Sequence, residues 1–168
     1  KQANGANLDA VMSSPAALTT GTGHNLDGPI TIEGFKIDGN MANQTGGQGQ
    51  GLVLASGGDS LGKRTRIERN LVVNTRGDGI VLTEYNADGT TLGAGGSAPT
   101  GVEARISNNE VLYSSGCGIW LRHSSSNYFT DGFCESNIVG YSEHDGIRLD
   151  SSSGWKIAGN HIYASGLR

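Results

Sequence analysis

Hydrophobic residues recur along this chain in short runs with a period of two rather than 3.6. The clearest runs begin with a Gly-Ile pair, at Gly79-Ile80, Gly118-Ile119 and Gly146-Ile147, and in each the isoleucine is followed two positions later by a leucine. Alternation of this kind is typical of a β-strand with one buried face. We predict that these residues point inward: Ile80, Leu82, Ile119, Leu121, Ile147 and Leu149.

An asparagine stands nine residues before each Gly-Ile pair, and a fourth opens a last, shorter unit. Spacing inside the unit is constant while the connections between units vary, which is typical of stacked repeats. We interpret the asparagines as structural, with stacked amides bonding the turn backbone. They are Asn70, Asn109, Asn137 and Asn160.

Two further short strands are predicted in each unit, one before the asparagine and one after it. The inward residues of the first are Ile67, Ile106, Cys134 and Ile157. The equivalent residues of the second are Val72, Leu112, Val139 and Tyr163. Earlier in the chain, Phe35 takes the place of the asparagine and is expected to point inward.

Three short strands per turn of about 23 residues predict an all-β fold, a right-handed parallel β-helix of about five coils. We predict a single domain over residues 1–168, with an irregular first coil over 1–29 and regular coils over 30–168. No capping helix precedes residue 1, so we expect a piece of a longer solenoid or a solenoid capped by another chain. The longest connection, 85–103, is of a length that is usually functional in a compact fold.

Net charge, the length of apolar runs and the number of cysteines each argue against a class of function. A net charge of −4 without a basic stripe argues against nucleic-acid binding. No apolar run is long enough to predict a membrane span. The two cysteines are too few for a disulfide framework: Cys134 reads as a core residue and Cys117 as a corner residue, and a bridge between them stays open.

The repeated units resemble the pectate-lyase superfamily of right-handed β-helices, which includes polysaccharide lyases, mannuronan C5-epimerases and phage tailspike proteins. The resemblance spans about 30–168 and rests on the segment Ile37-Asp38-Gly39-Asn40, the repeated I-x-x-N-x-V and the repeated DGI or CGI strand. It implies binding and processing of an extracellular or cell-surface polysaccharide. The catalytic Asp and His positions of the epimerases hold Val81 and Thr83 here, and Arg122 stands at their second Asp position.

Outward residues of successive coils form columns about 5 Å apart per step. One column is Val53, Val81, Trp120 and Arg148, and the next is Ala55, Thr83, Arg122 and Asp150. Trp120 and Arg148, with Tyr85, are candidates for substrate binding, since an aromatic ring can stack on a sugar and Arg can pair with a uronate carboxylate. Candidates for catalysis are Arg122, His123, Asp150 and Glu84.

These residues fit more than one chemistry. A lyase or epimerase would use Arg122 or His123 as the base and Asp150 as a charge stabiliser or Ca²⁺ ligand, although no clear calcium motif is present. An inverting hydrolase would use Glu84 with Asp150. The same Arg and Asp residues could instead form a surface ion-pair ladder without a ligand. A further alternative is a structural or receptor-binding segment of a phage tailspike or surface adhesin, assembled as a homotrimer at a virion or cell surface.

Overall fold

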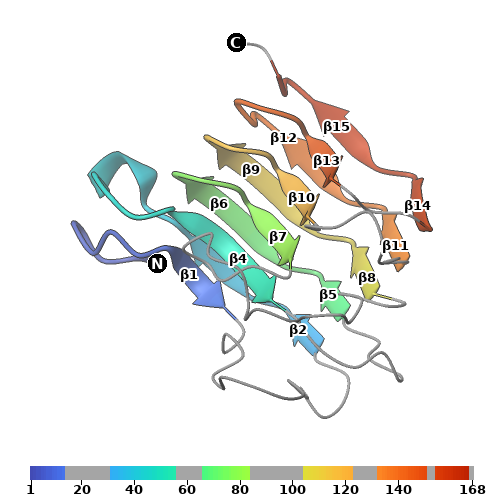
Figure 1. Cartoon of the computed structure of the whole chain (residues 1–168), viewed down its shortest axis with the longest axis horizontal. Helices are drawn as coiled ribbons and strands as arrows, with labels where there is room; N and C mark the ends of the chain where they lie inside the picture. The colour runs from blue at the N-terminus through green and yellow to red at the C-terminus, as the bar shows by residue number, and fades with distance from the viewer. Residues whose placement is uncertain (14–30, 56–65, 84–103, 123–131, 151–153, 167–168) are drawn as a thin grey trace.

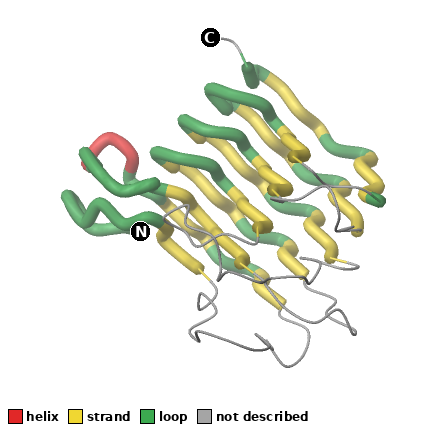
Figure 2. The backbone as a smooth tube through the Cα atoms, in the orientation of Figure 1, coloured by secondary structure: helices red, strands yellow, loops and turns green. Residues whose placement is uncertain are grey.

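In the described part of the chain, the regular structure consists of fifteen short strands and one 3₁₀ turn, η1 (Met41–Asn43). The computed structural model (Figures 1 and 2) describes residues 1–13, 31–55, 66–83, 104–122, 132–150 and 154–166. No α-helix occurs in these ranges, and none of the described residues form a helix long and apolar enough to cross a membrane. The predicted loop 85–103 lies outside them.

The strands form three five-stranded sheets, and every strand pairs in parallel with the strand three places further along the chain (Figure 1). Sheet A contains β1 (Ala10–Ser13), β4 (Gln50–Ala55), β7 (Ile80–Thr83), β10 (Ile119–Arg122) and β13 (Ile147–Asp150). Sheet B contains β2 (Thr31–Glu33), β5 (Arg66–Glu68), β8 (Ala104–Ser107), β11 (Gly132–Glu135) and β14 (Trp155–Ala158). Sheet C contains β3 (Lys36–Asp38), β6 (Leu71–Thr75), β9 (Glu110–Ser114), β12 (Ile138–Gly140) and β15 (His161–Tyr163). One strand from each sheet makes one coil, so the chain is a parallel β-helix of five coils, as predicted.

One narrow hydrophobic core runs between the three sheets. The predicted inward residues of sheets A and B pack in it and are fully buried in the middle coils: Ile80, Leu82, Ile119, Leu121, Ile67, Ile106 and Cys134. Leu149 and Ile157 hold the equivalent positions but are 38% and 40% exposed, because β13 and β14 are the last described strands of their sheets. The period-two pattern therefore identified the core residues of sheets A and B correctly.

Three of the inward assignments are wrong. Phe35 does occupy the column of the asparagines, but its side chain is half exposed. In sheet C the inward column is Val72, Val111, Val139 and Ile162. Leu112 and Tyr163 lie one position later and face outward, because a slip of one residue moves a side chain to the opposite face of a strand.

The glycine of each Gly-Ile pair is required by space at the corner between sheets C and A. A Cβ at Gly51, Gly79 or Gly118 would lie closer than 3.0 Å to a core valine Cγ1 of sheet C. It would also crowd the backbone of the next coil: at Gly118 it would stand 2.7 Å from the carbonyl oxygen of Gly146. The constant spacing of these glycines in the sequence is thus explained by the lack of room for a Cβ. None of the three glycines has a positive φ that would require glycine.

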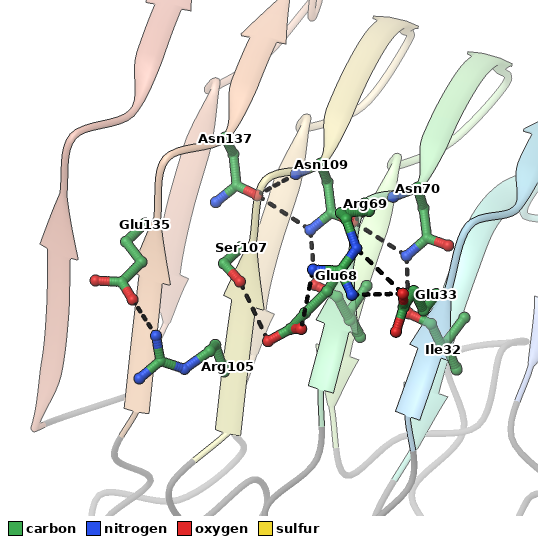
Figure 3. A network of polar contacts seen from close by, with 11 residues as sticks. Ile32, Glu33, Glu68, Arg69, Asn70, Arg105, Ser107, Asn109, Glu135 and Asn137 are labelled. Atoms are coloured by element: carbon green, nitrogen blue, oxygen red, sulfur yellow. Dashed lines mark hydrogen bonds and ion pairs between the residues drawn. The ribbon is translucent and has the colours of Figure 1, made fainter.

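A ladder of asparagine side chains closes the corner between sheets B and C (Figure 3). The Oδ1 of Asn109 accepts hydrogen bonds from both the backbone N–H and the Nδ2 of Asn70, at 3.0 and 3.1 Å. The Oδ1 of Asn137 accepts the same two hydrogen bonds from Asn109, and the Oδ1 of Asn160 accepts them from Asn137. Each Nδ2 also donates to a carbonyl of the preceding coil, as Asn109 does to Ile67 at 2.8 Å. The structural interpretation of these asparagines is confirmed.

We predict that Gly118→Ala lowers the free energy of unfolding by about 1–3 kcal/mol, because the added methyl overpacks a corner that has no room to relax. Urea denaturation followed by circular dichroism measures the change. Gly46→Ala is the matched control, since a Cβ there would approach nothing closer than 3.5 Å. Equal effects of the two substitutions would show that the corner packing is not the constraint.

Candidate functional site

The outer face of sheet A carries the predicted columns in the predicted register. Strand pairing aligns Val53 with Val81, Val81 with Trp120, and Trp120 with Arg148. The neighbouring column aligns Ala55, Thr83, Arg122 and Asp150 in the same way. Four of the seven candidate site residues are therefore brought together on two adjacent strands. Glu84, Tyr85 and His123 lie outside the described residues.

Asp150 links the two columns. Its Oδ2 accepts a hydrogen bond from the indole Nε1 of Trp120 at 3.0 Å. Arg148 donates from Nε to Oδ1 at 3.0 Å and its Nη2 lies 3.0 Å from Oδ2, which is a two-pronged ion pair. The pair raises the pKa of Arg148 through the hydrogen bond from its guanidinium to Asp150. Because both side chains are partly exposed, this pairing contributes little to stability.

Two guanidinium groups gather around the indole ring. The Cζ of Arg122 lies 4.6 Å from the ring centroid of Trp120, and the Cζ of Arg148 lies 5.1 Å from it. These distances are within the range of cation–π attraction. The indole ring of Trp120 thus lies against two positive charges, one from its own strand and one from β13, and its role in sugar stacking stays a prediction. We call Trp120, Arg122, Arg148 and Asp150 the arginine cluster.

Exposure on this face is uneven along the solenoid. Val53 and Val81 are each 1% exposed, although they are not part of the core between the sheets, and Thr83 is 2% exposed. Trp120, Arg122 and Asp150 are half-buried, whereas Arg148 is exposed. Among the described residues of these two columns, the accessible part of the face lies on β10 and β13.

A third column, which sequence reasoning missed, precedes the glycines and contains Gln50, Asp78, Cys117 and Asp145. Asp78 is buried and its Oδ1 accepts a hydrogen bond from the backbone N–H of Cys117 at 2.7 Å. Burial raises the pKa of Asp78, and the hydrogen bond from Cys117 and the charge of Arg122 oppose this shift. In the sequence, three of these residues stand directly before the glycine of a DGI or CGI strand, and this repeated position could have identified the column.

The two cysteines are both buried and free. Burial is the main cause that raises the pKa of Cys117 to about 11 and that of Cys134 to about 12, so both remain thiols at neutral pH. They lie in different parts of the coil, Cys117 before β10 and Cys134 within β11. The disulfide that the sequence left open is not formed.

Sheet B provides a contrast, because its outer face carries a simple ladder of ion pairs (Figure 3). Arg69 pairs with Glu33, and Arg105 pairs with Glu135. The Cζ of Arg105 also lies 4.8 Å from the ring centroid of Phe133. Here arginine–glutamate pairs prevail, and Arg69 also lies 3.9 Å from Glu68, whereas on sheet A two arginines converge on one ring. No group of three or more metal-ligating side chains occurs among the residues that the structure describes.

Comparisons with protein-family models, with curated proteins and with solved structures found no match to this chain. The parallel β-helix is therefore established from the chain's own strand pairing.

We predict that Asp78→Asn changes the pH dependence of stability. The pKa of Asp78 is higher in the folded chain than in the unfolded chain. The protonated carboxyl therefore contributes to the free energy of unfolding fully below a pH of about 4, and this contribution is lost as the pH rises through the folded pKa. The asparagine side chain keeps an oxygen that can accept the hydrogen bond from the backbone N–H of Cys117, and it carries no charge. The unfolding free energy of Asp78→Asn minus that of the natural chain should therefore increase between pH 4 and pH 7.

Urea titrations at both pH values measure this difference. Asp145→Asn, in the same column but exposed, is the matched control. A difference for Asp78→Asn that stays constant with pH would contradict the buried carboxyl described above.

Proposed function

We propose that the outer face of sheet A binds an acidic polysaccharide at the arginine cluster. The observation that carries this proposal is the convergence of Arg122 and Arg148 on the Trp120 ring, at 4.6 and 5.1 Å. Like charges held together on a partly exposed surface are favourable sites for an anion. The resemblance of the repeats to the pectate-lyase superfamily supports a uronic-acid polymer as the ligand. Such a protein would act outside the cell or at a cell or virion surface.

Recognition would use the planar fork of the guanidinium group. A uronate carboxylate can form the same two-pronged pair with Arg148 that Asp150 forms now. Asp150 thus competes with the ligand, and it would keep the Arg148 side chain extended when no ligand is bound. Arg122, packed on the indole ring, would contribute the second positive charge.

Processing of the bound chain is a further part of the proposal. Elimination next to a uronate requires a base, for which Arg122 is the described candidate. Hydrolysis requires two carboxyl groups, and the candidates are Asp150 and Glu84. Elimination leaves an unsaturated product that absorbs ultraviolet light, whereas hydrolysis produces only new reducing ends. Both can be followed in one reaction with polygalacturonate or alginate.

We predict that Arg122→Ala/Arg148→Ala weakens binding of polygalacturonate by at least about tenfold, since each charge-assisted hydrogen bond contributes roughly 1.5–3 kcal/mol. Asp150→Asn should strengthen binding, because it removes the competing carboxylate. Affinity electrophoresis of the full chain at low and high salt measures both effects, and added salt should weaken the natural chain's binding.

Arg105→Ala is the matched control, because it removes an arginine that also lies over an aromatic ring and pairs with an acid, but on sheet B. The proposal fails if Arg105→Ala weakens binding as much as the double substitution does. It also fails if no acidic polysaccharide retards the natural chain.

A second candidate is a structural or receptor-binding β-helix without catalysis. It is favoured by the bonds within the cluster, where Asp150 accepts from both Trp120 and Arg148 as in a surface ion-pair ladder. A trimeric mass together with no binding of any acidic polysaccharide would support this candidate instead.

A further inference from the structure

The outer face of sheet C carries tyrosine side chains on three successive coils. Tyr113 and Tyr141 stack face to face, with ring centroids 4.8 Å apart and an interplanar angle of 6°. The ring centroid of Tyr163 lies 5.3 Å from that of Tyr141, with an interplanar angle of 83°. The ring centroid of His161 lies 5.2 Å from that of Tyr163. Tyr113 and Tyr141 are 46% and 47% exposed. This is a different sheet from the one that carries the arginine cluster.

Tyr163 lies flat on the sheet because Gly140 leaves room for it. Strand pairing places Tyr163 directly beside Gly140. A Cβ built on Gly140 would stand 2.5, 2.7 and 2.9 Å from the Cζ, Cε2 and Cε1 atoms of the tyrosine ring. Three ring atoms at such similar distances mean that one face of the ring covers the glycine. The opposite face points away from the sheet.

The stacked pair forms a wall beside this ring. Its planes stand nearly perpendicular to Tyr163, so the two elements make a right-angled corner. Partial burial raises the pKa of Tyr163, and Tyr141, Glu110 and Tyr113 add to the rise. Glu110 is exposed and lies on the same face of sheet C, in the column of Ile138 and His161, which is next to the column of Gly140 and Tyr163. This face therefore combines an apolar ring face with a carboxylate and several hydroxyl groups. We call Tyr113, Tyr141, Tyr163 and Glu110 the tyrosine corner.

Backbone geometry gives no reason for tyrosine at two of these positions. Tyr113 and Tyr141 have φ values of 61° and 56°, in the left-handed region that a bulky residue rarely adopts. Asn74, a residue that tolerates this conformation, has the equivalent position one coil earlier, with a φ of 55°. Ala164, the equivalent residue one coil after Tyr141, has a φ of 49°, so the fold imposes this conformation at the corner whatever the residue. The two tyrosines adopt it at a conformational cost.

We propose that the tyrosine corner binds a pyranose unit of a polysaccharide, with the sugar's C–H face on the outer face of Tyr163. The wall formed by Tyr113 and Tyr141 would contact the edge of the sugar. Sugar hydroxyls would donate to the Glu110 carboxylate and exchange hydrogen bonds with the tyrosine hydroxyls. This site is independent of the arginine cluster and selects for ring shape and hydroxyl groups rather than for negative charge.

A sugar fits this surface better than an apolar face of a second copy of the chain would. Docking of an apolar protein surface would bury Glu110 and the tyrosine hydroxyls without partners, which is costly. A pyranose has one apolar face and a rim of hydroxyl groups, so it can cover the ring and satisfy the polar groups together. The carboxylate also disfavours a uronate at this corner, which makes a neutral sugar the better ligand.

The test is affinity electrophoresis of the full chain in gels that contain dextran, galactomannan, xylan or polygalacturonate. We expect at least one neutral polysaccharide to retard the natural chain. Tyr163→Ala and Tyr163→Leu should each weaken that binding by about threefold or more, the leucine variant because it keeps apolar volume but lacks the aromatic face. Phe133→Ala, which removes an outward aromatic ring from sheet B, should leave the binding unchanged. Urea midpoints establish that each variant is folded.

Several results would overturn the proposal. One is the absence of retardation by every neutral polysaccharide, and another is equal loss in Tyr163→Ala and Phe133→Ala. A dimer or trimer that Tyr163→Ala converts to monomer would show that the face joins copies of the chain. The Arg122→Ala/Arg148→Ala variant should keep its binding to the neutral polysaccharide. Failure of the tyrosine corner is therefore distinguishable from failure of the arginine cluster.

Discussion

Amide groups hydrogen-bonded from coil to coil fix the register on which the rest of this structure depends. At the corner between sheets B and C, Asn109, Asn137 and Asn160 each accept two hydrogen bonds from the preceding asparagine and donate one to that coil's backbone. Asn109 is 1% exposed, so any of these groups left without a partner would cost roughly 1–3 kcal/mol. A coil that slipped by one residue would break the ladder and turn its aliphatic side chains outward.

Because the register is fixed, the outward side chains of successive coils line up in columns on each sheet. The residues in these columns can differ from sheet to sheet without changing the core. Sheet B and the turn after β5 carry arginine–glutamate ion pairs. Sheet A instead brings two guanidinium groups over one indole ring. Sheet C carries aromatic rings, one of them lying on a glycine. Because the core residues are the same aliphatic types throughout, these surface differences are where function can be located.

Much of the fold could be predicted because the constraints repeat. The Gly-Ile pairs mark a corner where a Cβ has no room, and the asparagines mark a ladder, so both appear at constant spacing. Sheet C was harder, since its strands carry outward aliphatic and aromatic residues next to the inward ones. That ambiguity is why Leu112 and Tyr163 were assigned to the wrong face.

The site could be predicted in part. Parallel pairing places residues of equal position beside one another, which is why Trp120, Arg122, Arg148 and Asp150 were correctly grouped. Burial of Val53 and Val81 on an outward column depends on what covers that face, which a period-two pattern does not contain. The contacts of Arg122 and Arg148 with the indole ring depend on side-chain conformation, which sequence position alone does not determine.

Fluorescence of Trp120 provides the most direct test of whether the arginine cluster is a binding site. The chain has two tryptophans, so a Trp155→Phe variant would leave Trp120 as the only reporter. Titration of this variant with an oligogalacturonate should change the emission in a saturable way, and high salt should reverse the change, whereas dextran should have no effect. Unchanged emission at concentrations where the oligosaccharide binds the protein would contradict the account, because the ligand would then bind away from Trp120.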